Sequence, residues 1–577
     1  MIKTLISRTH QFLIAKPTTA SDRTSSRLWF GLSLGFALYY GSLALQKSFQ
    51  AEYVVQDDAR EYVFWMQRFL DPTLLPNDLI AQYFKSITPP GYAAFYHGMA
   101  ILGVHPLWVS KVLPVGLGLI TTFYSFALCL RLFPFPITGF ITTLLLNQSV
   151  WSRDDLGSAT PRAFVTPLFL AFLYYLLRHQ RLGILIVLVL QALIYPPLVF
   201  ITIALLCCTL WDGNTRRLNF NQLKFVGICV GFTAIALLPY GLASSQFAPV
   251  ITRDQAWTMP ELHPGGRHPF FNPNPWAFWL IGEHSGIIPP LMPPLIWLGV
   301  LLPILMRYPV RFPLVQQINH RIAILPRMVW VALGLFAAAH LLLLKLFFPT
   351  RYTTHTFRIV LAIAAGIVLT ILLDTLLRGC KTLVAQRRWI TLGTRLTLMT
   401  MTMLVFFTYP QVSQDFPRIN VRVIKDPSLY QFLKTQPKDT LVATLSDEAN
   451  NISTLAQRSV LFSKEHSLPF HLGYYRPIRQ RILDVMQAQY SSDLRAAKQT
   501  IDKYQIKLWL LDQPAFTPLY LTNSTWLSSF EPEFTIALTN LQQGKIPALT
   551  KLTHCSVFNT PQLMLLDAAC IKTAAEG

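Results

Sequence analysis

Long apolar segments recur along the first 409 residues of the chain, and shorter polar segments separate them. A helix of about 17–25 mostly apolar residues crosses a bilayer. The two short runs beside Tyr195-Pro196-Pro197 predict a kinked or V-shaped pair, because proline lacks an N–H donor and breaks the helix. In all, the pattern predicts about eleven spans, at 28–46, 108–130, 135–150, 163–177, 183–196, 197–211, 225–243, 288–306, 328–348, 357–377 and 390–409.

Basic residues gather in alternate loops between these runs. They are Lys3, Arg8, Lys16, Arg23 and Arg27, then Arg131, Arg178 and Arg181, then Arg216, Arg217 and Lys224, then Arg307, Arg311, Arg321 and Arg327, and finally Arg378, Lys381, Arg387, Arg388 and Arg395. Loops rich in Lys and Arg stay cytoplasmic. The alternation therefore predicts a polytopic α-helical membrane protein with its N-terminus inside and its C-terminus outside.

Composition agrees with this fold class. The chain is 52% hydrophobic and 13% charged, and its mean hydropathy is +0.39. Few soluble globular proteins have such values. The net charge of +21 follows from the cytoplasmic loops, so we interpret it as a topology signal and expect no nucleic-acid partner.

Four loops of the transmembrane module, residues 1–409, are expected on the outer face: 49–107, 151–162, 244–287 and 349–356. In the first loop, Tyr62, Trp65, Met66 and Phe69 recur at helical spacing, which predicts an amphipathic helix lying in the membrane interface. The third loop is long and irregular, as lids often are. Its Glu261, His263 and His268 show no ligand spacing, so we expect ordinary surface residues there.

The character of the sequence changes near residue 410, where charge becomes mixed. Short β-rich runs, Thr440–Leu445, Ser459–Phe462 and Lys507–Asp512, alternate with helical patterns such as Ser428–Lys434 and Tyr490–Tyr504. Residues 410–577 are therefore expected to form a soluble extracytoplasmic α/β domain.

Asp57 and Asp58 follow the first span closely and open the first loop. One interpretation is helix capping, since Asp is a favoured N-cap. Capping needs only one carboxylate, however, and a pair can bind a divalent cation, or one Asp can act as a base while its neighbour tunes its pKa. The sequence leaves both interpretations open.

A second acidic pair, Asp154-Asp155, lies in the short second loop beside Arg153. It could be a solvated loop with a local ion pair, or an acceptor or metal site on the same face as the first pair. Arg162 and Arg351 could be anchors at span ends. Arg351 is the only basic residue of its loop, on the face where positive charge is disfavoured, so it also suggests an anionic partner such as a lipid phosphate.

Cys555 and Cys570 are the only cysteines of the predicted exported domain. Between them, Asn559-Thr560-Pro561 predicts a turn that separates two apolar runs, Val557-Phe558 and Leu563–Leu566, so a hairpin could bring the sulfurs together. An oxidising compartment would permit the disulfide. Two unpaired buried thiols are the alternative.

This arrangement resembles the GT-C superfamily of integral-membrane glycosyltransferases, which includes oligosaccharyltransferase catalytic subunits, protein O-mannosyltransferases and the lipid A aminoarabinose transferase. The residues that carry the resemblance are the first-loop Asp57-Asp58, the second-loop Arg153-Asp154-Asp155, the Tyr195-Pro196-Pro197 apex, and Arg351-Tyr352 before a late span, together with the exported tail. The first motif departs from the Asp-x-Asp or Asp-Glu of better-known members, and no Trp-Trp-Asp signature occurs in the tail.

The resemblance implies transfer of a sugar from a polyprenyl-phosphate carrier to a lipid, glycan or protein acceptor on the extracytoplasmic face of the plasma (inner) membrane. It gives Asp57 or Asp58 the role of catalytic base or metal ligand, and it gives Asp154 and Asp155 a role in assisting the metal or acceptor. Arg351 would contact the donor phosphate, and Arg162 and Arg153 are further candidates for that role. A divalent cation, Mg²⁺ or Mn²⁺, would be held by Asp57, Asp58 and Asp154.

Two other function classes remain open from the sequence. A lipid or polysaccharide transporter or flippase would carry ionisable groups near the membrane midplane and often a two-fold repeat. Here the conspicuous acids lie at span ends and no repeat is evident. A non-catalytic envelope-assembly protein of the same fold is the third class, and the sequence separates it poorly from the enzyme.

Overall fold

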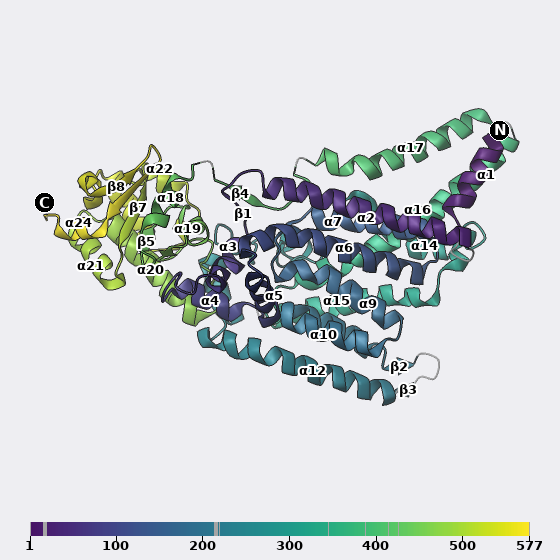
Figure 1. Ribbon diagram of the computed structural model, residues 1–577, viewed down its shortest axis with the longest axis horizontal. Coiled ribbons are helices and arrows are strands. Elements are labelled where there is room, and N and C mark those ends of the chain that lie inside the picture. Colours follow the sequence, from purple (N-terminus) through teal and green to yellow (C-terminus); the bar gives the residue numbers. More distant parts are fainter. Residues whose placement is uncertain are drawn as a thin grey trace.

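Long helices run side by side through the first two thirds of the chain and meet a smaller, sheet-containing domain at one end of the bundle (Figure 1). The computed structural model describes residues 2–15, 20–212, 217–218, 220–343, 345–386, 388–413, 415–424 and 426–575. Of the basic residues used to infer topology, Lys16, Arg216 and Arg387 lie outside the described residues.

Several helices of the bundle are apolar enough to cross a membrane. By length and composition, six of the described helices qualify. They comprise α2 (Ala20–Ser48), α6 (Pro106–Leu132), α12 (Phe220–Ser244), α15 (Ile324–Leu341), α16 (Thr350–Ala385) and α17 (Trp389–Val412). Shorter apolar helices lie between them: α7 (Pro136–Trp151), α9 (Val165–Leu177), α10 (Arg181–Ile194), α11 (Pro197–Cys207), and η6 (Pro294–Leu301) with α14 (Leu302–Met306). These helices make the chain a membrane protein, and the number of eleven spans stays a prediction.

Two helices form the centre of the bundle. Every residue of α7 is buried, and α16 packs along it, whereas α12 and α17 lie at the periphery with mostly exposed surfaces (Figure 1). The predicted break at Tyr195-Pro196 is present, since α10 ends at Ile194 and α11 begins at Pro197. The remaining elements of the bundle are α1 (Ile2–Leu13), β2 (Trp211–Asp212), β3 (Arg217–Leu218), η7 (Pro313–Gln317) and η8 (His320–Ala323).

The first outer loop folds into short elements wedged between the bundle and the smaller domain. They are β1 (Val54–Gln56), α3 (Ala59–Tyr62), η1 (Phe64–Phe69), α4 (Leu79–Ile87) and α5 (Pro90–Ile101). The expected interfacial amphipathic helix is wrong, because Trp65 and Met66 are buried in a 3₁₀ turn. The polar side of that turn faces protein rather than water, for the Gln67 amide donates to the Thr454 carbonyl at 3.1 Å.

The segment expected as the fourth outer loop, 349–356, is helical. Helix α16 begins at Thr350, so Arg351 lies in its first turn. The polar residues that follow Pro349 contain no further proline or glycine, so nothing stops the helix from extending about two turns beyond the apolar run. The second and third outer loops contain α8 (Asp154–Gly157), η2 (Pro161–Phe164), η3 (Ser245–Phe247), α13 (Arg253–Thr258), η4 (Pro260–Leu262) and the π-helical turn η5 (Ala277–Ile281).

The smaller domain is built on a five-stranded mixed sheet with strand order β6-β5-β7-β9-β8. Strands β6 and β7 both run parallel to β5, and β9 runs antiparallel to β7 and β8. The three strands predicted at Thr440–Leu445, Ser459–Phe462 and Lys507–Asp512 are its first three. The strands are β5 (Leu441–Thr444), β6 (Ser459–Val460), β7 (Leu508–Asp512), β8 (Ser556–Asn559) and β9 (Leu563–Asp567).

Helices cover this sheet and join it to the outer loops. The predicted helix at Ser428–Lys434 is α18, whereas the pattern at Tyr490–Tyr504 is split between the end of α20 and α21. The helical elements are α18 (Ser428–Thr435), α19 (Ala449–Leu455), α20 (Leu472–Tyr490), α21 (Leu494–Tyr504), α22 (Pro518–Thr522), η9 (Leu527–Ser529), α23 (Glu533–Gln542), η10 (Ala548–Lys551), η11 (Thr553–Cys555) and α24 (Ala568–Thr573).

The segment after α17 fastens the outer loops to one another. Its strand β4 (Val421–Val423) pairs antiparallel with β1 of the first loop. Just before it, the Arg418 backbone N–H donates to the Trp151 carbonyl at 2.7 Å, where the second loop begins. Gly157 allows the close approach of this segment, because a Cβ there would lie only 2.7 Å from Cγ2 of Ile419. The two acidic loops are therefore held together by main-chain contacts.

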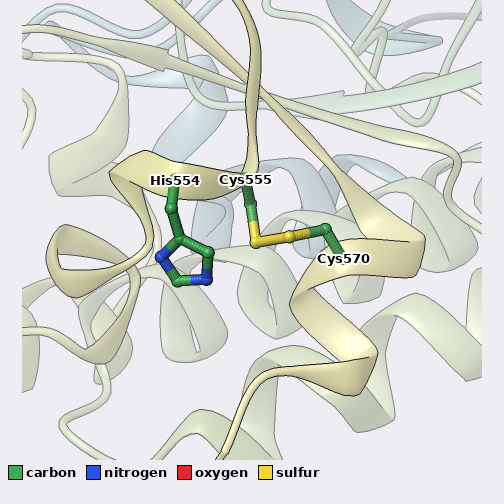
Figure 2. Close-up of side chains that lie close together, drawn as sticks. All are labelled: His554, Cys555 and Cys570. Atoms are coloured by element: carbon green, nitrogen blue, oxygen red, sulfur yellow. A yellow bond between two sulfur atoms is a disulfide. The ribbon is translucent and has the colours of Figure 1, made fainter.

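A disulfide joins Cys555 and Cys570 in the smaller domain (Figure 2). The predicted hairpin provides its geometry: β8 and β9 are antiparallel neighbours, Cys555 immediately precedes β8, and Cys570 lies in the helix after β9. The remaining five cysteines are free.

We expect the bridge to withstand purification, so that the unfolded, non-reduced protein has five reactive thiols and the reduced protein has seven. Closing a loop of this size stabilises a protein by about 3 kcal/mol in the chain-entropy model. Cys555→Ser should therefore lower the unfolding temperature of the smaller domain, and Cys380→Ser serves as the control. Seven reactive thiols without reductant would contradict the bridge.

Candidate active site

Three carboxylates from two loops converge on one arginine at the end of the bundle that meets the smaller domain (Figure 1). Nη2 of Arg162 lies 2.6 Å from Oδ2 of Asp58 and 3.4 Å from Oδ2 of Asp154. Its Nε lies 3.4 Å from Oδ1 of Asp155. The structure thus brings the first-loop and second-loop acids to a single guanidinium, which comes from η2 at the end of the second loop.

Asp58 does not cap the helix that follows it. It is the residue before α3, yet its side chain accepts no backbone N–H there, and the carboxylate points instead to Arg162. Asp57 faces a different way, because Arg60 and Arg422 both donate to its Oδ1, Arg422 at a distance of 3.1 Å. The two adjacent acids therefore have different partners, and only Asp58 belongs to the three-carboxylate cluster.

The second-loop pair is also divided between partners. Oδ2 of Asp155 accepts from Nη2 of Arg358 at 2.7 Å, and Arg358 on α16 is fully buried. Burial raises the pKa of Asp155, but Arg358 and Arg162 outweigh it and hold that pKa well below its usual range. Asp154 accepts from the Asn420 amide at 2.9 Å, so the segment after α17 contacts the cluster directly.

Within this cluster, Asp58 is the carboxyl group whose pKa is raised towards neutral pH. The surrounding protein removes water from it and raises its pKa to about 6, although Arg162 opposes the change and Asp154 adds to it. Its side chain remains about one quarter exposed, at 26%. A carboxylate with such a pKa is ionised at neutral pH and is still basic enough to accept a proton from an acceptor hydroxyl.

Arg153 and Arg351 lie beside the cluster but have no carboxylate within ion-pair distance among the residues that the structure describes. Burial lowers the pKa of Arg153 and Asp155 raises it, while Arg358, Arg351 and Arg162 lower it further, so the four guanidinium groups lie near one another. Such a group of positive charges is suited to bind an anion.

His355 and Arg358, which the sequence analysis did not single out, belong to this site. With Arg351 they recur every three to four residues along α16, so all three lie on one face of the helix. The ring of His355 meets Tyr195 edge to face, with centroids 6.2 Å apart, at the break between α10 and α11. The signal in the sequence was a basic residue at i+4 and another at i+7 from Arg351.

A second charged network joins the first loop, the third loop and the smaller domain. Nη2 of Arg267 lies 2.8 Å from Oε1 of Glu61 and 2.6 Å from Oε1 of Glu465. Glu465 also pairs with Arg60 at 3.1 Å. The third loop is therefore fastened across the site rather than free in solvent, and the expectation of ordinary surface residues there is wrong for Glu261, which is buried and accepts from Tyr475.

The four aspartates do not fit a metal ion as they are arranged. Asp58, Asp154 and Asp155 already face Arg162, which lies where a shared cation would bind, and Asp57 is held by Arg60 and Arg422. Within the described ranges, the one set of three metal-ligand side chains whose ligand atoms meet is His554, Cys555 and Cys570. Both sulfurs of that set form the disulfide (Figure 2).

No family model matches the chain, and no curated protein sequence matches it. A similar solved structure is the Archaeoglobus fulgidus oligosaccharyltransferase tethered with an acceptor peptide containing the NVT sequon, at 12% identity and a TM-score of 0.49, covering 87% of this chain and 72% of that chain. Another is the archaeal oligosaccharyltransferase AglB from Archaeoglobus fulgidus with an inhibitory peptide and a dolichol-phosphate, at 12% identity and a TM-score of 0.44, covering 89% and 72%.

A further structure of the Archaeoglobus fulgidus oligosaccharyltransferase, in complex with Zn and sulfate, is similar at 11% identity and a TM-score of 0.44, covering 87% of this chain and 70% of that chain. These three similar structures are all of the Archaeoglobus fulgidus oligosaccharyltransferase.

We expect Arg162→Gln to destabilise the protein, because it leaves Asp58, Asp154 and Asp155 near one another without their shared cation. Removing one partner of a buried ion pair costs about 3 kcal/mol or more. Unfolding of the variant in detergent, followed by temperature, measures the loss. Adding Asp154→Asn to Arg162→Gln should recover part of it.

Arg495→Gln is the matched control, since its pair with Asp493 is 2.8 Å long, largely exposed and distant in sequence from the cluster. Such pairs contribute about 1 kcal/mol or less. An equal loss in both variants would mean that Arg162 does not hold the cluster together.

Proposed function

We propose that the protein is a glycosyltransferase that moves a sugar from a polyprenyl-phosphate-linked donor to an acceptor on the extracytoplasmic face of the membrane. The observation that carries the proposal is the pairing of a basic carboxylate, Asp58, with an adjacent group of arginines at the outer end of a membrane bundle. Transfer from a lipid phosphate needs a base for the acceptor and positive charge for the departing phosphate.

In this reaction Asp58 is the proposed catalytic base. It takes the proton of an acceptor hydroxyl or amide while the acceptor atom forms a bond to the anomeric carbon of the sugar. The bond between that carbon and the phosphate oxygen breaks, and its electron pair leaves with the polyprenyl phosphate. Arg351 and Arg153, which have no carboxylate partners in the described residues, stabilise the charge that develops on the phosphate.

The other acids position this base. Arg162 holds Asp58 against Asp154 and Asp155, so these two residues act through Arg162 and Asn420 rather than through a metal ion. Asp57 fixes the start of the first loop through Arg60 and Arg422. We therefore assign Asp57, Asp154 and Asp155 as positioning residues.

We further propose the topology that the sequence predicts, with the active site and residues 410–577 outside the plasma (inner) membrane. The disulfide of the smaller domain supports this placement, because disulfides persist in oxidising compartments. The acceptor is a lipid, glycan or protein that reaches the site from the outer face.

The test uses purified full-length protein in nanodiscs with a radiolabelled polyprenyl-phosphate sugar fraction and a membrane acceptor fraction. We expect loss of label from the lipid and gain in the acceptor. A transporter would instead move labelled lipid across a vesicle bilayer without cleaving it, and a non-catalytic assembly protein would do neither.

Asp58→Asn should lower the transfer rate by about a hundredfold or more, since the amide cannot accept the acceptor proton. Asp57→Asn should have a smaller effect, because among the described residues the ion pairs of that side chain are with Arg60 and Arg422 rather than with Arg162. Both variants should insert and fold, as shown by unchanged gel filtration. Full activity of Asp58→Asn would contradict the assignment of the base.

The pH profile of transfer should follow the ionisation of Asp58. Its pKa is raised to about 6, so the carboxylate form is lost as the pH falls through that value, and the rate should fall with it. Stability changes the other way, because the raised pKa favours folding at low pH and this contribution is lost as the pH rises through about 6. A rate independent of pH between about 5 and 8 would contradict this role.

Transfer should continue after removal of divalent cations, because Arg162 supplies the positive charge among the carboxylates. The measurement is the initial rate in excess EDTA, compared with rates in added Mg²⁺ or Mn²⁺. Abolition by EDTA with recovery in Mn²⁺ would show that Arg162 moves aside and that the aspartates bind a metal.

A further inference from the structure

The first three turns of α16 carry polar N–H groups that are enclosed by protein and have no partner among the described residues. Arg358 is fully buried, and only its Nη2 is used, so Nε and Nη1 donate to nothing in the described structure. His355 is 4% exposed and neither ring nitrogen has a partner. Nε of Arg351 is likewise unpartnered.

Unpartnered buried donors are rare, because each costs about 1–3 kcal/mol when it loses water without gaining an acceptor. Three neighbouring side chains on one helix face share this condition here. All three can donate, and the carboxylate of Asp155 already pairs with Arg358 and Arg162. The missing partner is therefore an anion with several acceptor oxygens, which is the chemistry of a phosphate group.

The net charge of the site indicates how much negative charge a well-matched anion carries. Four guanidinium groups, those of Arg153, Arg162, Arg351 and Arg358, surround three carboxylates, those of Asp58, Asp154 and Asp155. One positive charge is left over. The neighbouring Arg60, Arg267 and Arg422 pair instead with Asp57, Glu61 and Glu465.

The histidines of this region do not add to that charge. Burial and the nearby Arg351 lower the pKa of His284 to about 3, so its imidazole is neutral at physiological pH. His355 lies among the same arginines, and like charges disfavour its protonated form. A neutral imidazole still donates one N–H to a phosphate oxygen.

We propose that the donor carries a single phosphate, as a polyprenyl monophosphate sugar, and that Arg351, His355 and Arg358 bind that phosphate. This inference rests on the proposed function. A phosphodiester brings one negative charge, which matches the site, whereas a diphosphate brings two and leaves one buried charge without a counter-charge.

The charge of the site also matches the charge of the phosphate during the reaction. When the bond from the anomeric carbon to oxygen breaks, the phosphate leaves as a monoester with a second negative charge. The acceptor proton that moves to Asp58 removes one negative charge from the site at the same step. Site and leaving group therefore stay balanced for a monophosphate, and the transition state is stabilised as charge develops.

The test measures binding of the two possible leaving groups without catalysis. Full-length protein in nanodiscs is titrated with farnesyl phosphate or farnesyl diphosphate in EDTA, and binding is followed as the rise in unfolding temperature. We expect half-saturation by the monophosphate at about a tenfold lower concentration than by the diphosphate. Asp58→Asn removes a negative charge from the site and should tighten binding of the monophosphate.

Arg351→Gln and His355→Ala are the informative variants, because neither residue pairs with a carboxylate, so the ion pairs of the cluster remain intact. Each should weaken binding of farnesyl phosphate by about tenfold. Arg378→Gln, at the other end of the same helix and paired with Asp374, is the matched control and should bind as the unaltered protein does.

The outcomes separate this inference from the function on which it rests. Tighter binding of the diphosphate, with or without added Mn²⁺, would overturn the single-phosphate donor and leave the transferase proposal standing. Preference for the monophosphate that is unchanged in Arg351→Gln and His355→Ala would overturn the assignment of these residues. Binding of neither lipid would overturn both the inference and the proposed function.

Discussion

The candidate site depends on one interaction, the sharing of the Arg162 guanidinium by three carboxylates. Asp58 comes from the first loop, and Asp154 and Asp155 come from the second. Without a cation between them, three partly buried acids would repel one another, and the two loops would be destabilised where they meet. With it, one carboxylate can have a raised pKa while another stays fully ionised, as the pKa directions of Asp58 and Asp155 indicate.

Backbone hydrogen bonds around the cluster hold Asp58, Asp154 and Arg162 in position. Strand β4 pairs with β1, and the Asp57 backbone N–H donates to the Asn420 carbonyl at 2.9 Å. From α5, the hydroxyls of Tyr92 and Tyr96 both donate to the carbonyl of Ala159, at 3.0 and 3.2 Å. Ala159 has a positive φ of 53°, a conformation that a non-glycine residue keeps only where its surroundings enforce it. The site is thus preorganised before any substrate binds.

The sequence was informative wherever a local pattern determines structure. Apolar runs located the helices, Pro196 located the break between α10 and α11, and the Asn559-Thr560-Pro561 turn located the hairpin beside the disulfide. It failed where polar residues continue a helix or are covered by another domain. Arg351 was assigned to a loop because the apolar run begins later, and the polar side of η1 was assigned to water although α19 lies against it.

The sequence likewise predicted some residues of the candidate site and missed others. The two acidic pairs were found because adjacent aspartates at span ends are conspicuous, but their partners were not. Arg358 and His355 lie within a mostly apolar helix, and Asn420 follows the last span by several residues, so no local pattern links them to Asp154 or Asp155. Only the folded chain brings together residues that are more than 200 positions apart.

The central claim is that this arrangement of acids and arginines binds a polyprenyl lipid by its phosphate. Native mass spectrometry of the protein, released from its own membrane in mild detergent, tests the claim most directly. We predict a bound polyprenyl-phosphate lipid, with or without its sugar, that is retained in Arg378→Gln and lost in Arg351→Gln. A bound lipid without a polyprenyl phosphate, or equal occupancy of the polyprenyl lipid in both variants, would contradict the account.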